Sequence, residues 1–190
     1  MSTRSQNSAY KSALTSRFTH PLKRKHLNLH NLQMFKHRPL RDPNTYLRHL
    51  YLLPRKCNID VDGQTVLRCE LMSSPIKRAP PYVGLSYTWG DPKLRRPVAI
   101  GERVFHVTEN LAIALEHLQE EEKTLVLWVD AVCIDQENQT EKSIQVQQMG
   151  EIYTSAVLVI AWLGISADES DLALQELKRY HKNMSCSATK

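Results

Sequence analysis

The sequence predicts an α/β fold in which a mostly parallel sheet is flanked by helices. Two apolar runs, residues 124–133 and 157–164, have the length and composition of strands that are buried on both faces. Between them, Asn138 and Glu141 have the spacing of a capping box, which predicts a helix from there to about Ser155. A strand, a helix and a strand at this spacing indicate a βαβ crossover, so we expect the two apolar strands to lie side by side and parallel.

The N-terminal half adds shorter elements that are typical of antiparallel hairpins, starting near Tyr46. Asp62-Gly63 and Gly101-Glu102 are the expected hairpin turns. Thr108 is the expected N-cap of an amphipathic helix that continues to about Glu121. In chain order, the expected strands of this half are residues 59–61, 66–71, 82–89, 98–100 and 103–107. After the second apolar run, a last helix is expected over residues 168–181.

Positive charge is concentrated at the N-terminus. Residues 1–41 contain nine Lys or Arg and no Asp or Glu, whereas residues 42–190 contain sixteen basic and twenty acidic residues. We therefore expect a basic, disordered tail over residues 1–41, a mildly acidic domain over 46–183 and a polar tail over 184–190. The alternative for the first segment is a mitochondrial transit peptide, which is also rich in Arg and Ser. Because the folded part is not basic, nucleic acid is not an expected partner.

The remaining composition favours one domain in a reducing compartment. A chain of 190 residues that is 42% hydrophobic can bury one core. Its cysteines form neither a C-x-x-C pair nor a zinc-site spacing, so we expect no disulfide framework and no metal. No stretch has the length of a membrane span, and no signal-peptide core follows the start. The expected location is the cytoplasm, or the mitochondrion if the basic segment is a transit peptide.

Four ordered segments carry a resemblance to a known family. They are YVGLSYTWGD (residues 82–91), VTENL (107–111), LWVDAVCIDQ (127–136) and the stretch from Glu141 to Gly164. Together they are similar to the heterokaryon incompatibility (HET) domain of filamentous fungi, with the core of the match over residues 82–164. One departure is Gly84, which stands where the family usually has Ala.

This resemblance implies a role in vegetative incompatibility, in which fusion of genetically different hyphae triggers cell death. The HET domain is also remotely similar to TIR domains, which implies a TIR- or flavodoxin-like sheet. Some TIR domains hydrolyse NAD with a Glu on a helix, so NAD is a candidate substrate, and no cofactor is assigned. The rival hypothesis is a non-enzymatic module that signals by self-association or by binding a protein partner. Whether the chain is an enzyme stays open between the two.

Glu141 is the candidate catalytic carboxylate. We expect it on the flank of the apolar side of its helix, where partial burial would raise its pKa. A carboxylate in such a place could bind ribose hydroxyls and stabilise a ribosyl cation while nicotinamide departs. The alternative is that Glu141 only caps the helix start.

Asp130 and Asp135 are candidate ligand-binding residues because they follow the first apolar run. Ligands of open α/β sheets bind beyond the carboxyl ends of the strands, so Asp130 could bind a ribose hydroxyl there. The alternative for both residues is a turn in which the carboxylate accepts backbone N–H groups.

Ser86, Trp89 and Gly90 are the remaining candidates, at the end of the strand that begins near Tyr82. Ser86 and the backbone of Gly90 could face a phosphate or ribose, and Trp89 could stack on a base. The alternative for Trp89, and for Tyr87 beside it, is core packing, which we favour. If the apolar strands are parallel neighbours, the acidic residues at their ends share one cleft.

Overall fold

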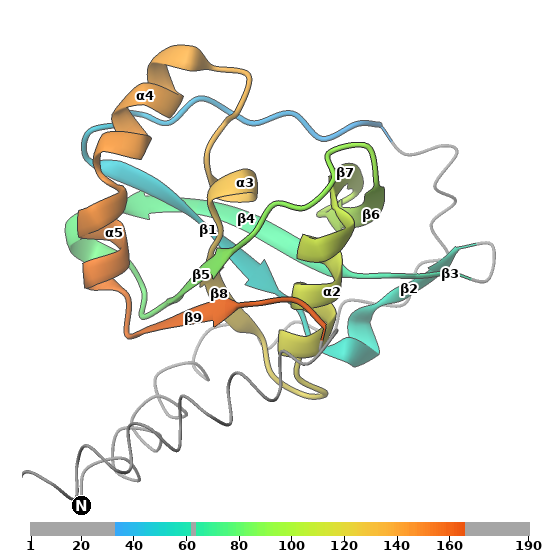
Figure 1. The fold of residues 1–190 in the computed structure, drawn as a ribbon. Coiled ribbons are helices and arrows are strands. Elements are labelled where there is room, and N and C mark those ends of the chain that lie inside the picture. The colour runs from blue at the N-terminus through green and yellow to red at the C-terminus, as the bar shows by residue number, and fades with distance from the viewer. Residues whose placement is uncertain (1–32, 62–63, 166–190) are drawn as a thin grey trace, which may run out of the picture.

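The computed structural model of the protein describes residues 33–61 and 64–165 (Figure 1). The first 32 residues, the turn Asp62-Gly63, the expected helix 168–181 and the C-terminal tail lie outside these ranges. In chain order, the elements are β1 (Tyr46–Leu52), η2 (Arg55–Cys57), β2 (Ile59–Val61), β3 (Gln64–Val66), β4 (Arg68–Pro75), η3 (Ile76–Arg78), β5 (Val83–Tyr87), β6 (Arg95–Ile100), β7 (Arg103–Thr108), α2 (Glu109–Leu118), β8 (Leu125–Trp128), α3 (Asp130–Cys133), α4 (Gln139–Gln147), α5 (Met149–Ser155) and β9 (Leu158–Trp162).

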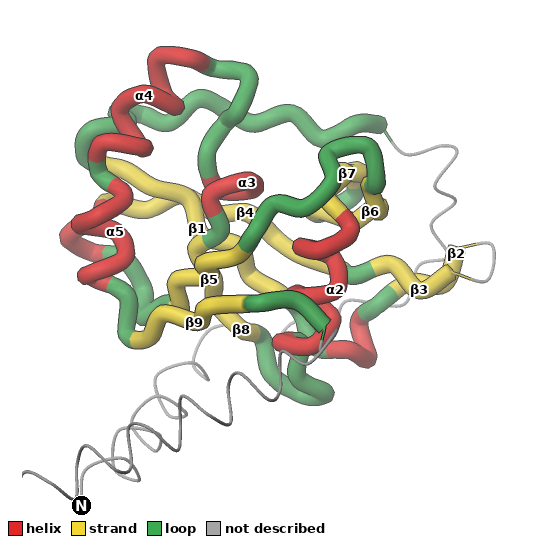
Figure 2. The backbone as a smooth tube through the Cα atoms, in the orientation of Figure 1, coloured by secondary structure: helices red, strands yellow, loops and turns green. Residues whose placement is uncertain are grey.

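Seven of these strands form one mixed sheet in the order β7-β6-β4-β1-β8-β5-β9 (Figure 2). β5 is parallel to β8 on one side and to β9 on the other, and β4 is parallel to β6. β1 is antiparallel to both of its neighbours, and β6 and β7 form the expected hairpin. β2 and β3 pair in a separate antiparallel sheet. The α/β class is confirmed, with helices flanking a sheet that is parallel around β5.

The two apolar runs are parallel, but they are not neighbours. β5 lies between β8 and β9, so β9 is an edge strand and not the buried strand that was expected. The side chains of Leu158 and Val159 are 48% and 45% exposed. The prediction of a buried strand here was wrong because an apolar run does not report whether a second strand will cover its outer edge.

The first apolar run contains a strand and a helix. β8 ends at Trp128, and the N–H groups of Val132 and Cys133 donate to the carbonyl of Val129 at 3.0 and 2.7 Å, closing the short helix α3. Cys133 is therefore buried in a helix and not in a strand. Periodicity alone does not distinguish a short buried strand from a buried helical turn.

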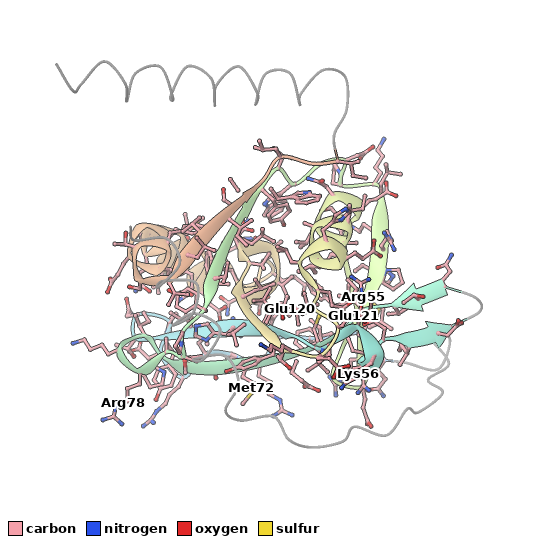
Figure 3. All side chains as sticks on the ribbon, turned by 90° about the horizontal axis from the view of Figure 1, so that it is seen from below. Arg55, Lys56, Met72, Arg78, Glu120 and Glu121 are labelled. Carbon is pink, nitrogen blue, oxygen red and sulfur yellow. The ribbon has the colours of Figure 1, made fainter. Side chains whose placement is uncertain are left out.

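The core lies between the sheet and the helices that pack on it. Trp128 and Tyr82 are its largest buried side chains, and the Tyr82 hydroxyl donates to the carbonyl of Ile152 in α5 at 2.5 Å. α2 packs on β6 and β7 through a buried face that includes Leu111 and Leu115. The side of β4 that carries Met72 points away from the helices (Figure 3).

The helix expected from Asn138 to Ser155 is present as α4 and α5, which meet at Gln148. The buried residue of α5 is the apolar Ile152, whereas the buried residues of α4 are the polar Glu141 and Gln145. The amide nitrogen of Gln145 donates to the carbonyls of Pro43 and Tyr46 at 2.6 and 3.0 Å. α4 therefore packs against backbone carbonyls. A buried apolar side chain in place of Gln145 would leave these carbonyls without hydrogen-bond donors.

Residues 33–45 form an extended segment, here called the strap, which crosses the molecule before β1. The N–H of Phe35 donates to the carbonyl of Val104 at 2.8 Å, and the N–H of Val104 donates to the carbonyl of Gln33 at 3.1 Å. Leu40 is buried at its other end. We expected residues 33–41 in the disordered tail, but they lie against β7 and α4.

Candidate functional site

Four of the six predicted site residues lie near the carboxyl ends of β5 and β8. The two strands are parallel, with Gly84 opposite Trp128, so the residues that follow them emerge at the same edge of the sheet. There the indole N–H of Trp89 donates to Oδ2 of Asp130 at 3.1 Å. Ser86 and Gly90 are exposed beside this pair. This edge is where open α/β sheets bind their ligands.

Asp130 is the first residue of α3 and is partly buried. Burial raises the pKa of its carboxyl group, and the hydrogen bonds from Trp89 and from the N–H of Ala131, the latter 2.7 Å long, only partly oppose this. A partly desolvated carboxylate forms stronger polar contacts than one in water, which suits it to bind hydroxyl groups. The bond to Ala131 also fits the turn alternative, so Asp130 serves the turn and faces the site.

Tyr87 and Trp89 differ in burial. The side chain of Trp89 is 46% exposed, so its assignment to the core was wrong. The hydroxyl of Tyr87 is buried and has no hydrogen-bond partner among the described residues. Burial, with a further contribution from the charge of Asp130, raises the pKa of Tyr87 above its ordinary value. A buried hydroxyl without a partner beside a desolvated carboxylate is a group that a ligand or water could satisfy.

Asn110 also lies at this edge of the sheet, but it was not among the predicted site residues. Its side-chain nitrogen donates to the carbonyl of Thr88 at 2.5 Å, and its side-chain oxygen accepts from the indole N–H of Trp162 at 3.1 Å. Asn110 therefore ties the start of α2 to the ends of β5 and β9 and fixes the loop that carries Trp89. The signal was present, because Asn110 lies in one of the four segments of the family resemblance.

Gly90 adopts a backbone φ of +73°, and a Cβ atom there would lie 3.3 Å from Cβ of Asn110. A left-handed conformation at this position favours glycine and lets the chain reverse directly after Trp89. Gly90 is therefore a turn residue. It follows Trp89, whose indole N–H donates to Asp130 just beyond β8.

Glu141 lies apart from this edge, in a buried ion pair with Arg48 of β1. Its two carboxylate oxygens accept from the two terminal nitrogens of Arg48 at 2.5 and 2.9 Å. The N–H groups of Asp135 and Leu40 also donate to it, at 3.1 and 3.5 Å. The side chains of Arg48 and Glu141 are only 5% and 3% exposed. Each carboxylate oxygen therefore has two donors from the protein.

The pKa of Glu141 is lowered, whereas we expected it to be raised. Burial does act to raise it, but the hydrogen bond and charge of Arg48, together with the N–H of Asp135, outweigh burial. The capping alternative is correct for the backbone, since the side-chain oxygen of Asn138 accepts from the N–H of Glu141 at 3.1 Å. The carboxylate itself turns inward to Arg48.

The clamp formed by Arg48 and Glu141 joins segments that are distant in the chain. Arg48 also donates to the carbonyl of Arg38 in the strap at 2.7 Å and to the carbonyl of Cys133 in α3 at 3.0 Å. The strap, β1, α3 and α4 are thus fastened at one point. The sequence signal for this partner of Glu141 was Arg48 itself, which is the one Arg or Lys in the segment that forms β1.

Asp135 belongs to the clamp region and to a turn. Its carboxylate accepts from the N–H of Glu137 at 3.1 Å and lies 3.7 Å from Nδ1 of His37 in the strap. The turn alternative is therefore observed for Asp135, and no hydrogen bond between described residues joins its side chain to the Trp89–Asp130 pair. The six predicted residues divide into a group at the sheet edge and a pair at the clamp.

The described residues contain no group of three or more His, Cys, Asp or Glu side chains that could hold a metal ion. Cys57, Cys69 and Cys133 are free thiols. Within the same part of the chain, no helix is long and apolar enough to cross a membrane.

Comparison with known proteins adds a family to this geometry. Residues 82–190 match the family model described as "Heterokaryon incompatibility protein (HET)". A relative from Neurospora crassa, "Heterokaryon incompatibility protein 6, OR allele", is 34% identical over 160 residues, which cover 77% of this chain and 23% of the relative. The chain thus corresponds to less than a quarter of that protein's length. No solved structure gives a significant match.

Proposed function

Because the chain belongs to the family of heterokaryon incompatibility (HET) proteins, we propose that it is an effector domain that promotes cell death after non-self recognition between fungal hyphae. Membership in this family supports a role in vegetative incompatibility. We propose further that the domain acts by associating with another protein chain. The observation that supports this mode of action is the exposed apolar edge strand β9.

β9 has the features of a strand that accepts a partner. It pairs with β5 on one side, and no described strand covers its other side. Apolar side chains along and beside it are largely exposed, namely Val157 (54%), Leu158 (48%), Val159 (45%), Leu163 (73%) and Ile165 (62%). Residues 156–165 contain no Lys, Pro or acidic residue, which are the residues with which proteins block open edges. An apolar edge of this kind favours strand addition from a second chain.

A lysine on this strand tests the proposal. Leu158→Lys places a charge on the edge, and Val146→Lys places the same charge on α4 at a residue that is likewise 48% exposed. Each full chain is expressed inducibly in a fungal host and scored for cell death, and its oligomeric state is measured by light scattering. We expect Leu158→Lys to lose both association and toxicity and Val146→Lys to keep both. Wild-type association and killing by Leu158→Lys would contradict the proposed edge.

NAD hydrolysis is the second candidate function, and the Trp89–Asp130 pair is the observation that favours it. An exposed indole offers a stacking surface, and a desolvated carboxylate at the strand ends could bind ribose hydroxyls and stabilise a ribosyl cation. Glu141, the carboxylate originally expected in this role, has all its donors inside the protein. It could reach a substrate only if the clamp opened.

Nicotinamide release from NAD by the purified chain tests the role of Asp130. Asp130→Asn keeps the acceptor for Trp89 and removes the charge, so it abolishes turnover if Asp130 supports the ribosyl cation. Wild-type turnover by Asp130→Asn would exclude that role. If the wild type shows no turnover at concentrations where it associates, the non-enzymatic mode is favoured.

The cytoplasm remains the proposed location, with the mitochondrion as the alternative. Deletion of the basic residues 1–32 in a fluorescently tagged chain distinguishes the two, because a transit peptide is required for import. This deletion leaves the strap intact.

A further inference from the structure

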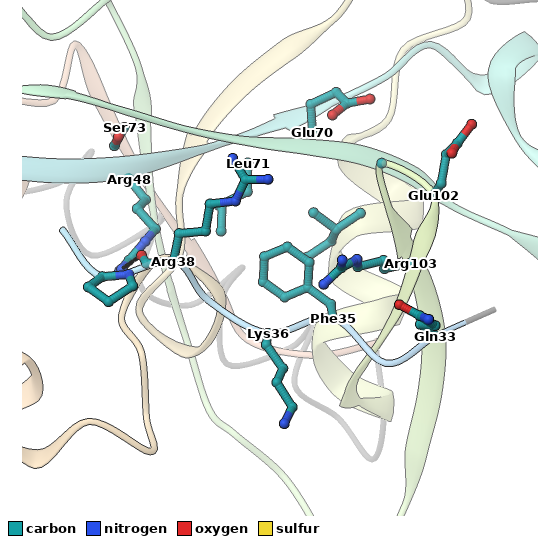
Figure 4. A pocket seen from close by; sticks show the side chains of 13 residues that line it. Gln33, Phe35, Lys36, Arg38, Arg48, Glu70, Leu71, Ser73, Glu102 and Arg103 are labelled. Carbon is teal, nitrogen blue, oxygen red and sulfur yellow. Dashed lines mark hydrogen bonds between the residues drawn. The ribbon is translucent and has the colours of Figure 1, made fainter.

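A cavity of about 780 Å³ lies between the strap and the sheet (Figure 4). Its walls come from the strap, from β1 and β4, and from the hairpin of β6 and β7. None of the predicted site residues lines it. The volume falls in the range of roughly 300–1,000 Å³ that is typical of small-molecule sites.

The strap side of the cavity and the start of β7 are basic. Arg38 and Arg103 line the cavity, and Figure 4 shows their side chains on either side of the Phe35 ring, while Lys36 points away. The ion pairs between described residues include none to these three cations. Two guanidinium groups at one open cavity attract an anion, and the planar fork of each guanidinium suits phosphate oxygens.

Phe35 provides an apolar surface between the two guanidinium groups. Its ring is partly buried and is held by edge-to-face contacts with Phe105 and His37, at centroid distances of 5.9 and 5.2 Å. The N–H of Phe35 donates to the carbonyl of Val104, and the carbonyl of Gln33 accepts from the N–H of Val104. The ring is therefore fixed in the cavity wall, where a planar group could stack on it without first ordering a loop.

Glu70 of β4 lines the cavity from the sheet side. Burial raises the pKa of this carboxyl group, Arg68 acts to lower it, and the nearby charge of Glu102 raises it further. Side chains alternate along a strand, so the carboxylate of Glu70 lies on the face of β4 that carries Met72, on the other side of this strand from the Phe35 ring (Figure 4).

We propose that this cavity binds a phosphorylated nucleoside, with the phosphate on Arg38 and Arg103 and the base stacked on Phe35. Every base offers a flat π-surface, so the site accepts more than one base. The clamp shapes the cavity, because Arg48 holds the carbonyl of Arg38 and Glu141 holds the N–H of Leu40. This site is independent of β9 and of the Trp89–Asp130 pair.

Calorimetric titration of the full chain with AMP and UMP tests the proposal, with adenosine and inorganic phosphate as partial ligands. We expect both nucleotides to bind and each partial ligand to bind at least tenfold more weakly. Arg103→Gln is expected to weaken AMP at least tenfold, because it removes a charge-assisted hydrogen bond. Phe35→Leu is expected to weaken AMP about fivefold or more, through loss of stacking.

Two control variants keep the test specific. Lys77→Gln and Arg78→Gln each remove one positive charge from an exposed site in η3, and both should leave the affinity for AMP within twofold. Circular dichroism confirms that each variant is folded. The proposal is overturned if neither nucleotide binds, if inorganic phosphate binds as tightly as AMP, or if Lys77→Gln weakens AMP as much as Arg103→Gln does.

Discussion

The buried ion pair between Arg48 and Glu141 makes the sharpest prediction for stability. Glu141→Gln preserves the shape of the side chain but removes its charge. Arg48 is 4% exposed and would keep a buried positive charge, with only neutral acceptors, namely the Gln side-chain oxygen and the carbonyls of Arg38 and Cys133. Removing one partner of a buried pair costs about 3–5 kcal/mol. In a domain of this size, that lowers Tm by roughly 6–20 °C.

Thermal and denaturant unfolding, followed by circular dichroism, measure this loss. Glu137→Gln is the matched control, since Glu137 is exposed in the turn before α4 and its substitution should change stability by less than about 0.5 kcal/mol. The double variant Arg48→Met with Glu141→Leu replaces the charges by apolar groups, so we expect it to be more stable than Glu141→Gln. A free energy of unfolding for Glu141→Gln within about 1 kcal/mol of wild type would refute the reasoning.

The same pair predicts how stability depends on pH. Despite burial, the hydrogen bond and charge of Arg48 hold the pKa of Glu141 below its usual 4.5. Its contribution is therefore present above about pH 4.5 and is lost as pH falls through the lowered folded pKa. Glu141→Gln should remove this dependence. Toxicity of a folded double variant would also show that killing does not need the Glu141 carboxylate.

Three further outcomes follow from buried groups. Gly84→Ala should destabilise the domain by about 1–3 kcal/mol, because the added Cβ would lie 2.8 Å from the Tyr153 ring; Tyr153→Leu in the same chain should relieve part of this loss in denaturant unfolding. Burial lowers the pKa of His49 from 6.5 to about 4. As pH drops from 6.5 to about 4, the unfolded state takes up a proton that the folded state does not, so the stability of the folded state should fall. His49→Leu should abolish this effect in denaturant unfolding, and an acid profile unchanged by the substitution would contradict it. Burial raises the pKa of Asp130, so Asp130→Asn should be at least as stable as wild type at pH 7, and a loss above about 1 kcal/mol would argue against this account.

The sequence alone determined the α/β class, the hairpin of β6 and β7, the position of α2 and the parallel direction of β8 and β9. These features depend on local periodicity, turn residues and the handedness of short connections, all of which are written into neighbouring residues. It also placed Asp130 and Trp89 at strand ends, and the hydrogen bond between them follows from two parallel strands ending at one edge.

The tertiary structure decided which segments became neighbours. The insertion of β5 between β8 and β9 left β9 exposed at the edge, and the choice of Arg48 as partner for Glu141 joined residues 93 positions apart. It also carried the strap across the molecule to β7, which created the basic cavity. Amphipathic patterns report that a side chain is buried, but not which distant group it meets, because that choice depends on how the whole chain closes around its core.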